Sequence, residues 1–347
     1  MKIAQIAPLF ESVPPRGYGG TERIVSWLTE ELVRQGHEVT LYASGDSQTR
    51  AALRAGSPSA LRQKTHYLND LPYHIAMLEA VLKEADRFDV IHSHLDYLGF
   101  PFARRITTPF LTTIHGRLDQ AELGSIYREY QELPLISISN AQRSPLEDAH
   151  WAGTIYHGLP GDLLTLGTGQ GGYLAFLGRI SAEKGIADAI RIAQHAGIPI
   201  KIAAKVDPRD AEYFKTVAPL IESPGVEFVG EIGDDDKASF LGNARVLLFP
   251  IDWPEPFGLV MIEAMACGTP VIAYRRGSVP EIMRDRVTGF IVDNQAQAVA
   301  AVRRVETLDR RRVRQEFETR FTATRMANDY VQLYQTFATV GIDPILG

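Results

Sequence analysis

Two carboxylates in one short stretch have the spacing most suggestive of chemistry. Glu255 lies in a loop between two prolines, and Glu263 follows after seven intervening residues, within a run of good helix formers at 259–266. Because that run is otherwise apolar, a buried Glu263 needs a partner or a ligand. On the second helical turn it could accept hydrogen bonds from the vicinal hydroxyls of a ribose, while Glu255 could reach a different hydroxylated group. The simpler alternative is a solvated Glu263 and a Glu255 that only complements the helix dipole.

The N-terminal end of this helix is suited to an anion. Gly258, between Phe257 and Leu259, leaves the first backbone N–H groups uncovered, and the positive end of the helix dipole faces the loop. A diphosphate is the anion that fits best. Arg179 and Lys184 flank another strand-to-helix turn, where a planar guanidinium and a point ammonium would suit the same diphosphate. From charge alone, however, two ordinary surface cations are the simpler interpretation.

A further strand-to-helix turn lies near the N-terminus. Gly19 and Gly20 end a glycine-rich loop, and we expect Thr21 to cap the helix that follows. Such a loop can cradle a phosphate or let a ligand approach the backbone, or it can be only a tight turn. It lacks the G-x-G-x-x-G spacing of dinucleotide-binding sites.

Histidines and aspartates raise the question of a metal. His115 ends a strand, at the edge where open α/β sheets bind ligands, so it either faces the ligand or is structural. His92 and His94 share one face of another strand, but no third zinc ligand has a recognisable spacing. Three successive aspartates at 234–236 look like a metal-binding cluster, yet they precede an expected helix whose dipole accounts for them better. We therefore expect no metal site.

The elements that must position these residues alternate between strands and helices, which predicts open parallel α/β sheets. We expect strands in the first half at 2–7, 39–43, 90–94, 110–114, 135–139 and 154–156. In the second half we expect them at 173–177, 200–204, 226–229, 246–249, 271–273 and 290–292. Glycine density peaks at 158–171, which predicts an interdomain linker. The resulting domains are 1–160 and 171–320, with a final helical segment at 321–347.

Five separated stretches resemble motifs of the retaining nucleotide-sugar glycosyltransferases of family 4. They are Gly19-Gly20-Thr21-Glu22-Arg23, the Thr-x-His-Gly around His115, the Gly-Arg-x-x-x-x-Lys-Gly of 178–185, the paired glutamates of 255–263, and the Gly-x-x-Pro-Glu turn at 277–281. They occur in the expected order and span nearly the whole chain. The chain departs from the family pattern at the domain crossing, where His157 and Pro160 replace an Asn-Gly pair and an acidic residue.

The resemblance implies a GT-B architecture, two Rossmann-like domains with parallel sheets facing across a cleft. The N-terminal domain would take the acceptor, the C-terminal domain the nucleotide sugar, and the final helix would cross back to the first domain. Arg179 and Lys184 would stabilise the leaving diphosphate, helped by the amides near Gly258 and Gly20.

The same resemblance gives the remaining donor contacts. Glu263 would hold the ribose, Glu255 would hold the donor sugar near the reacting carbon, and His115 would lie beside that sugar. Gly19, Phe257 and Leu259 would complete the donor site.

Bulk composition is consistent with a soluble two-domain protein. The chain has 347 residues, 45% of them hydrophobic and 22% charged. A net charge of −6 argues against nucleic-acid binding. A single cysteine, the absence of a signal-peptide core and the absence of a run of about 18–20 apolar residues favour a cytoplasmic location. These features leave peripheral membrane contact open.

The sequence therefore predicts a retaining, metal-independent hexosyltransferase that needs no cofactor. UDP-sugars are the first choice of donor and GDP-mannose the second. The acceptor, a carbohydrate, a lipid-linked molecule or another small molecule, is not identified. Two alternatives remain, a GT-B-shaped nucleotide-sugar epimerase and a non-catalytic nucleotide-sugar binding protein.

Overall fold

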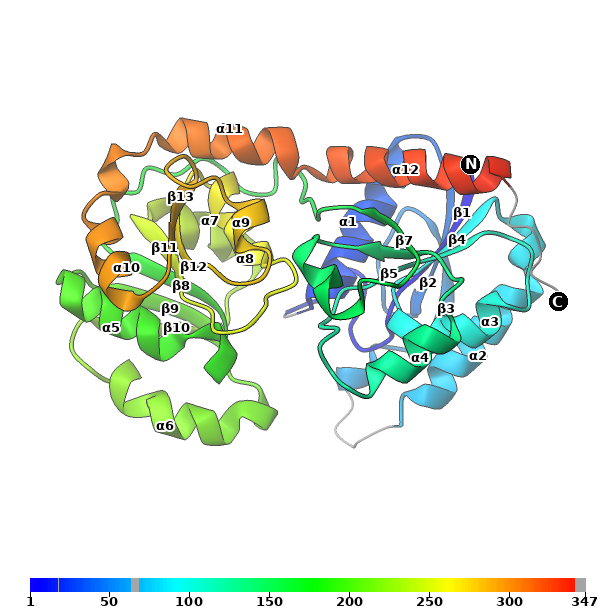
Figure 1. Cartoon of the computed structure of the whole chain (residues 1–347), viewed down its shortest axis with the longest axis horizontal. Coiled ribbons are helices and arrows are strands. Elements are labelled where there is room, and N and C mark those ends of the chain that lie inside the picture. Colours follow the sequence, from blue (N-terminus) through cyan, green and yellow to red (C-terminus); the bar gives the residue numbers. More distant parts are fainter. Residues whose placement is uncertain (18, 64–68, 341–347) are drawn as a thin grey trace. The chain divides into compact units, whose positions relative to one another are not determined.

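The computed structural model describes residues 1–17, 19–63 and 69–340 (Figure 1). Tyr18 of the glycine-rich loop and residues 341–347 of the expected C-terminal segment lie outside the described residues. The chain divides into two compact units. The first contains Met1–Gly158 together with the chain from Ala323 onward, and the second contains Leu159–Thr322.

The first unit is built on a parallel sheet, with seven strands in the described residues and the order β3-β2-β1-β4-β5-β6-β7. Its strands are β1 (Lys2–Ile6), β2 (Glu38–Ser44), β3 (Ala52–Ser57), β4 (Val90–Ser93), β5 (Phe110–Thr113), β6 (Leu135–Ser137) and β7 (Trp151–Thr154). In register, Ile3 of β1 lies between Val39 of β2 and Val90 of β4. The residues of β4 and β5 are buried throughout, as expected of parallel strands covered on both faces.

Helices cover this first sheet (Figure 1). They are α1 (Gly20–Arg34), α2 (Leu71–Lys83), α3 (Phe100–Ala103), α4 (Leu123–Glu129) and α12 (Ala323–Val340). The terminal helix α12 lies beside α1. Its Tyr330 and Tyr334 are fully buried, so this last helix is part of the core of the first unit.

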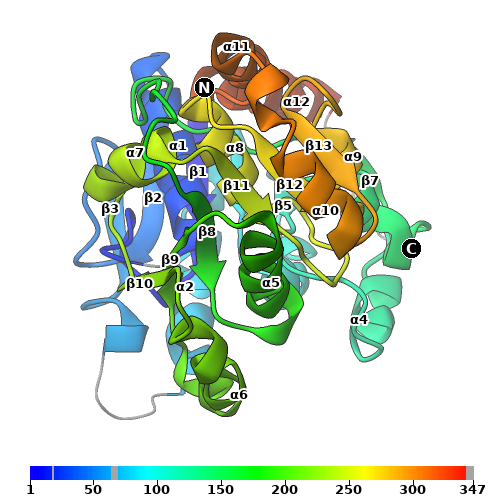
Figure 2. The ribbon, with the colours of Figure 1, turned by 90° about the vertical axis from the view of Figure 1, so that its left-hand side faces the viewer.

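The second unit repeats the design with a parallel sheet whose described strands have the order β10-β9-β8-β11-β12-β13. Its strands are β8 (Leu174–Arg179), β9 (Ile200–Lys205), β10 (Val226–Gly230), β11 (Val246–Phe249), β12 (Val271–Tyr274) and β13 (Gly289–Val292). Its helices are α5 (Ile186–Ala196), α6 (Ala211–Ile221), α7 (Asp234–Asn243), α8 (Leu259–Ala266), α9 (Val279–Ile282), α10 (Gln295–Val302) and α11 (Arg310–Arg320). Helices α5 and α10 lie side by side against the sheet (Figure 2).

The prediction of two parallel α/β units is confirmed, and most expected strands lie within a residue or two of their positions. The last strand of the first sheet is displaced, because β7 spans Trp151–Thr154 whereas we expected 154–156. The first helix also begins differently. Gly19 is its N-terminal cap and Thr21 lies inside the helix, so the predicted threonine cap is wrong.

The glycine-rich stretch 158–171 was expected to be a linker, but from Leu159 onward it packs as part of the second unit. The backbone N–H groups of Gly167, Gly169 and Gly171 donate to carbonyls of Cys267, Gly242 and Asn243. A Cβ on Gly167 would lie 2.1 Å from the carbonyl oxygen of Gly242. These glycines therefore permit close backbone packing rather than flexibility.

Among the described residues, no helix combines the length and the apolar character that a membrane span requires.

Candidate functional site

The candidate residues of the second unit lie where its sheet changes direction. Strand β8 neighbours both β9 and β11, so the chain moves to one edge after β8 and returns to the other side with β11. Ligands of open α/β sheets bind beyond the carboxyl ends of the strands at such a point. Arg179 is the last residue of β8, and Glu255 follows β11 in the loop that leads to α8.

A buried ion pair joins the two loops at this point. Lys184 Nζ donates to Glu255 Oε2 at 2.5 Å, and Trp253 Nε1 donates to the same oxygen at 2.8 Å. The Lys184 ammonium also lies 5.0 Å from the centroid of the Trp253 ring. Glu255 is only 8% exposed. Removing one partner of such a pair leaves an uncompensated buried charge.

Gly277 and Ser278 form a turn that packs against the loop carrying Glu255. A Cβ on Gly277, whose φ is +48°, would lie 2.4 Å from the backbone nitrogen and oxygen of Glu255. The Ser278 N–H donates to the Glu255 carbonyl, and Ser278 Oγ donates to the Phe257 carbonyl, both at 2.9 Å. The Gly277–Ser278 turn therefore supports the loop that carries Glu255.

Helix α8 begins and ends where the sequence predicts. Gly258 caps its N-terminus in the left-handed conformation with a φ of +78°, and Gly268 follows its C-terminus with a φ of +66°. Glu263, on its second turn, is 4% exposed. Its Oε1 accepts a hydrogen bond of 2.6 Å from Lys237 Nζ. The expected need of Glu263 for a partner is thus met by a lysine of α7.

Lys237 was not among the predicted site residues. It lies in the first turns of α7, and Asp234 is its second carboxylate partner at 3.3 Å. A signal was present in the sequence, because Lys237 is the only cation of this helix and a cation near a helix N-terminus opposes the helix dipole. Asp234–Asp236 occupy the first turn, as predicted for charges that complement the dipole.

Arg179 is held apart from the Lys184 pair by partners of its own. Its Nε lies 3.1 Å from Asp210 Oδ2, and its Nη2 donates to Glu183 Oε1 at 3.3 Å. Two carboxylates therefore neutralise the guanidinium in this state. An anion bound by Arg179 would have to replace or join them.

In the first unit, Gly19 and Gly20 lie at the start of α1, after β1. A Cβ on Gly19 would lie 2.8 Å from Pro15 Cβ, so the loop has no room for a side chain there. Glu22 provides an acidic group in the first turn, and burial raises the pKa of its carboxyl. The start of α1 therefore carries its own negative group.

His115 follows β5 and is half-buried against a cluster of imidazoles that includes the buried His92, His94 and His157. Its Nε2 lies 2.8 Å from His94 Nδ1, and its ring stacks on that of His157 with centroids 5.2 Å apart. Burial lowers the pKa of His115 to about 3. The imidazole is consequently neutral at physiological pH.

A hydrogen-bond chain fixes the tautomer of this imidazole. Gln5 Nε2 donates to the Tyr334 hydroxyl at 3.0 Å, and Gln5 Oε1 accepts from His94 Nε2 at 2.9 Å. The remaining nitrogen of His94 is then an acceptor for His115 Nε2–H. His115 therefore carries its proton on Nε2, and its Nδ1 is an acceptor.

His92 and His94 share a face, as predicted, with ring centroids 4.1 Å apart. His92 bonds to the Tyr334 hydroxyl through Nδ1 and to Thr113 Oγ1 through Nε2, both at 2.7 Å. Ring nitrogens of this pair are thus used in hydrogen bonds within the unit. In the part of the chain that the structure describes, no group of three or more His, Cys, Asp or Glu side chains is arranged to hold a metal ion.

The predicted site residues separate between the units. The second unit holds Arg179, Lys184, Glu255, Phe257, Gly258, Leu259 and Glu263, and the first holds Gly19, Gly20 and His115. Within the second unit, the loops after β8 and β11 and the start of α8 form one connected group. The partners Lys237, Asp210 and Gln5 were missed because each comes from a distant element.

Two protein-family models match the chain. One, described as glycosyl transferases group 1, matches residues 168–320, and the other, described as glycosyltransferase family 4, matches residues 18–147. Each match falls within a different half of the chain.

Characterised proteins are similar over most of their length. The phosphatidyl-myo-inositol mannosyltransferase of Mycobacterium leprae is 26% identical over 375 residues, covering 98% of each chain. The D-inositol 3-phosphate glycosyltransferase of Mycolicibacterium smegmatis is 25% identical over 352 residues, covering 84% of this chain and 79% of that protein. The crystal structure of Anabaena HepE in complex with UDP and glucose has a TM-score of 0.72 at 17% identity and covers 97% of this chain and 100% of that one. This likeness confirms the predicted GT-B fold.

Proposed function

The chain belongs to the group 1 glycosyltransferases, and we propose that it transfers a hexose, with retention of configuration, from a nucleotide-diphosphate sugar to a hydroxyl acceptor. The observation that carries the proposal is the arrangement around α8. Two buried carboxylates, Glu255 and Glu263, flank the start of this helix, where the cap residue Gly258 has no side chain to bond the first N–H groups, and each carboxylate is paired with a lysine from another element. The two carboxylates can accept hydrogen bonds from the hydroxyls of a donor, on both sides of a helix terminus that can bind an anion.

The proposed donor is a UDP-sugar, with GDP-mannose as the second choice. Anabaena HepE, which shares the fold, is described in complex with UDP and glucose. The relative from Mycobacterium leprae is a mannosyltransferase. We assign Glu263 to the ribose hydroxyls, because its pairing with Lys237 holds the carboxylate in place on α8.

The diphosphate is assigned to Arg179, Lys184 and the amides at the start of α8. In the structure both cations are engaged by carboxylates. Phosphate oxygens would replace or join these carboxylates when the donor binds, so that each cation meets the charge that develops on the leaving group.

Glu255 and His115 are assigned to the donor sugar. Glu255 Oε2 already accepts from Lys184 and Trp253, so Oε1 is the atom assigned to a sugar hydroxyl. This engagement makes Glu255 a poor nucleophile. We therefore assign deprotonation of the acceptor to the leaving phosphate, on the face where the acceptor attacks, which retains the configuration. His115 would accept from a sugar hydroxyl through Nδ1.

A thermal-shift screen of the full chain with UDP-, GDP- and ADP-sugars tests the proposal first. We expect one nucleotide series to raise the melting temperature and the free nucleotide to be released when acceptor is added. Stabilisation without release would favour a non-catalytic binding protein. Conversion of the donor to a stereoisomer would favour an epimerase.

The two glutamates are expected to fail differently when replaced by glutamine. Glu263→Gln should weaken the binding of free UDP and of the UDP-sugar about tenfold or more, because a charge-assisted hydrogen bond contributes about 1.5–3 kcal/mol. Glu255→Gln should leave UDP affinity near that of the parent and lower the turnover of the donor. Calorimetry with UDP alone, beside donor kinetics, separates the two effects.

Glu227→Gln is the matched control for this pair. Glu227 belongs to the same unit and is paired with Lys201, but its side chain is 58% exposed. It should behave as the parent in both measurements. If Glu255→Gln loses UDP affinity while Glu263→Gln keeps it, the assignment of the two carboxylates is reversed.

Turnover is expected to survive a chelator. The charge of the diphosphate is assigned to Arg179, Lys184 and backbone amides, and Asp234 is engaged by Lys237 at the start of α7. Initial rates with and without EDTA should therefore agree. Loss of turnover with EDTA, restored by manganese or magnesium, would return Asp234–Asp236 to the list of candidate ligands.

A further inference from the structure

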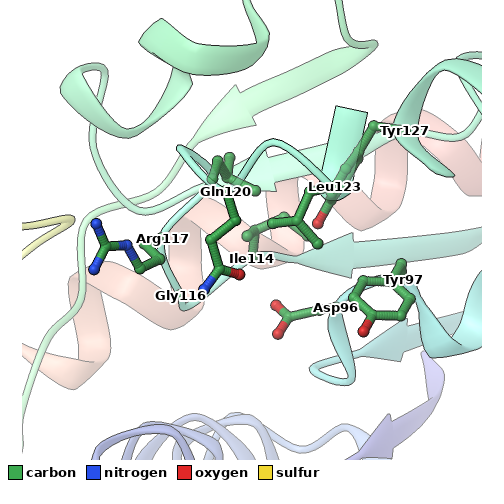
Figure 3. Close-up of a pocket in the computed structure, with 9 residues that line it drawn as sticks. Asp96, Tyr97, Ile114, Gly116, Arg117, Gln120, Leu123 and Tyr127 are labelled. Atoms are coloured by element: carbon green, nitrogen blue, oxygen red, sulfur yellow. The ribbon is translucent and has the colours of Figure 1, made fainter. Parts of the chain in front are cut away.

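A cavity of about 280 Å³ opens in the first unit next to His115 (Figure 3). It lies beyond the carboxyl ends of β4 and β5, the edge at which open α/β sheets bind ligands. The lining residues are Asp96, Tyr97, Ile114, Gly116, Arg117, Leu118, Gln120, Leu123 and Tyr127. All of them belong to the first unit, so the cavity is complete within it.

Asp96 is the feature of this cavity that calls for a ligand. Its Oδ1 is buried and has no hydrogen-bond partner among the residues that the structure describes. Burial raises the pKa of Asp96 to about 6, and this effect outweighs a hydrogen bond from the His115 backbone, which lowers the pKa. A buried polar atom without a partner is unfavourable by roughly 1–3 kcal/mol, and a ligand that donates to it removes this penalty.

The backbone at Asp96 is strained as well, with a φ of +47°. Residues other than glycine adopt this left-handed conformation rarely, and Asn and Asp adopt it most readily. The strain fixes where the carboxylate projects. Figure 3 shows Asp96 and Gln120 projecting toward the same space, which places a second polar side chain beside the carboxylate.

The charges around the cavity argue against an anionic ligand. Arg117 is the only cation among the lining residues that the structure describes, and its guanidinium is engaged by Asp119 through hydrogen bonds of 2.6 and 2.7 Å. Asp96 is the only acid among the described lining residues, and its buried Oδ1 has no hydrogen-bond partner there. A phosphate would therefore place its negative charge beside this carboxylate, next to a guanidinium already shared with Asp119.

The remaining walls suit the carbon skeleton of a small ring. Tyr97 and Tyr127 contribute aromatic surface, and Ile114, Leu118 and Leu123 contribute aliphatic surface. A ligand here meets apolar walls and a few convergent polar groups, the usual composition of a small-molecule site. The volume lies just below the range of about 300–1,000 Å³ that is typical of sites for drug-sized molecules, and so it suits one ring rather than an oligosaccharide.

We propose that this cavity is the acceptor subsite, and that it binds a neutral polyhydroxylated ring, of the sugar or cyclitol class, with one hydroxyl donating to Asp96 Oδ1 and another bonded to Gln120. The inference rests on the proposed glycosyl transfer, since the donor charges are assigned to the second unit and the first unit is left to supply the acceptor. The site selects a ring without a phosphate, in contrast to the D-inositol 3-phosphate that the name of the relative from Mycolicibacterium smegmatis specifies.

Ligand-observed NMR on the full chain tests the cavity directly. The probes are myo-inositol and methyl α-D-glucopyranoside, with glucose 6-phosphate as the anionic counterpart. We expect at least one neutral probe to bind and glucose 6-phosphate to bind more weakly. Asp96→Asn should lower the affinity for the neutral probe at least tenfold, and Gln120→Ala should lower it several-fold. Asp86→Asn, on the exposed surface of the same unit, should have no effect.

Both variants should keep the parent melting temperature, because asparagine tolerates a positive φ and Gln120 is exposed. A loss of affinity would then not result from unfolding. The proposal is overturned if neither neutral probe binds the parent, if Asp96→Asn binds the probe as the parent does, or if glucose 6-phosphate binds more tightly than the glucoside. UDP affinity, measured on the same samples, reports on the proposed function separately. Absence of UDP affinity together with absence of GDP and ADP affinity in the parent would refute nucleotide-sugar transfer, whereas probe binding alone decides the chemistry of the cavity.

Discussion

Replacement of Lys184 by alanine should lower the turnover of the donor by about a hundredfold, the loss typical for removal of one preorganised donor to a developing charge. Lys184 is assigned to the leaving diphosphate and is also the partner of the buried Glu255. Its removal therefore takes away a cation and leaves a carboxylate uncompensated beside the sugar. Arg179→Ala should also lower turnover, because Arg179 is the last residue of β8 and lies at the same carboxyl edge of the sheet. Initial rates at saturating donor measure both effects.

Asp235→Ala is the control for these substitutions. Asp235 is exposed in the first turn of α7, so its removal should leave turnover within a small factor of the parent. The double variant Lys184→Ala/Glu255→Gln separates the two consequences of losing Lys184, since it removes the stranded charge as well as the cation. Parent-like rates for Lys184→Ala and Arg179→Ala would refute the assignment of a diphosphate clamp.

The first unit should lose stability steeply as the pH falls below neutrality. Burial is the main cause that lowers the pKa of His92, His94, His115 and His157 in the folded chain, to about 3 for His115. The unfolded chain, with an ordinary pKa near 6.5, binds protons that the folded chain refuses, so stability is present above pH 6.5 and is lost below it. Between pH 7.5 and 5.5 the loss for His115, whose folded pKa is about 3, is about 1.4 kcal/mol, and the other three histidines add to it in the same direction.

Hydrogen exchange of the β4 and β5 amides measures this loss within the first unit, without requiring both units to unfold together. His157→Asn should reduce the pH dependence, because it removes one of the imidazoles whose pKa is lowered. His150→Asn, at an exposed position of the same unit, should leave the pH dependence unchanged. His74 is also buried with a lowered pKa and adds to the loss in the same direction. Protection that stays constant from pH 7.5 to 5.5 would show that the imidazoles are not excluded from protonation.

The sequence was most informative where local rules decide the structure. Helix α8 spans the predicted residues because strong helix formers lie between two glycines that both adopt a positive φ. Thr21 failed as a predicted cap because the helix begins one residue before it, at Gly20, with Gly19 as its cap. Most of the stretch 158–171, predicted to be a linker, is packed within the second unit, because glycine serves close packing as well as flexibility.

Contacts between distant elements could not be predicted from one sequence. The burial of Glu263 was expected, but its partner Lys237 comes from a different helix, and nothing in the residue spacing announces the pairing. The same holds for Lys184 and Glu255, which are 71 residues apart and which the sequence assigned to different parts of the ligand. Asp96 carried no motif at all, and only the cavity makes it a candidate.

The discontinuity of the first unit also has a consequence for how the chain is made. His92 in β4 bonds to the Tyr334 hydroxyl of α12, which is 242 residues later and emerges from the ribosome only after the whole second unit. Domains usually fold in the order of their synthesis, the N-terminal one first. Here the second unit, which is continuous from Leu159 to Thr322, can fold before α12 is available to the first unit. Until then, His92 lacks its bond to the Tyr334 hydroxyl. The first seven strands to be made therefore complete their packing only after α12 has been synthesised. Until then their apolar surface is exposed, and the chain is most prone to aggregate.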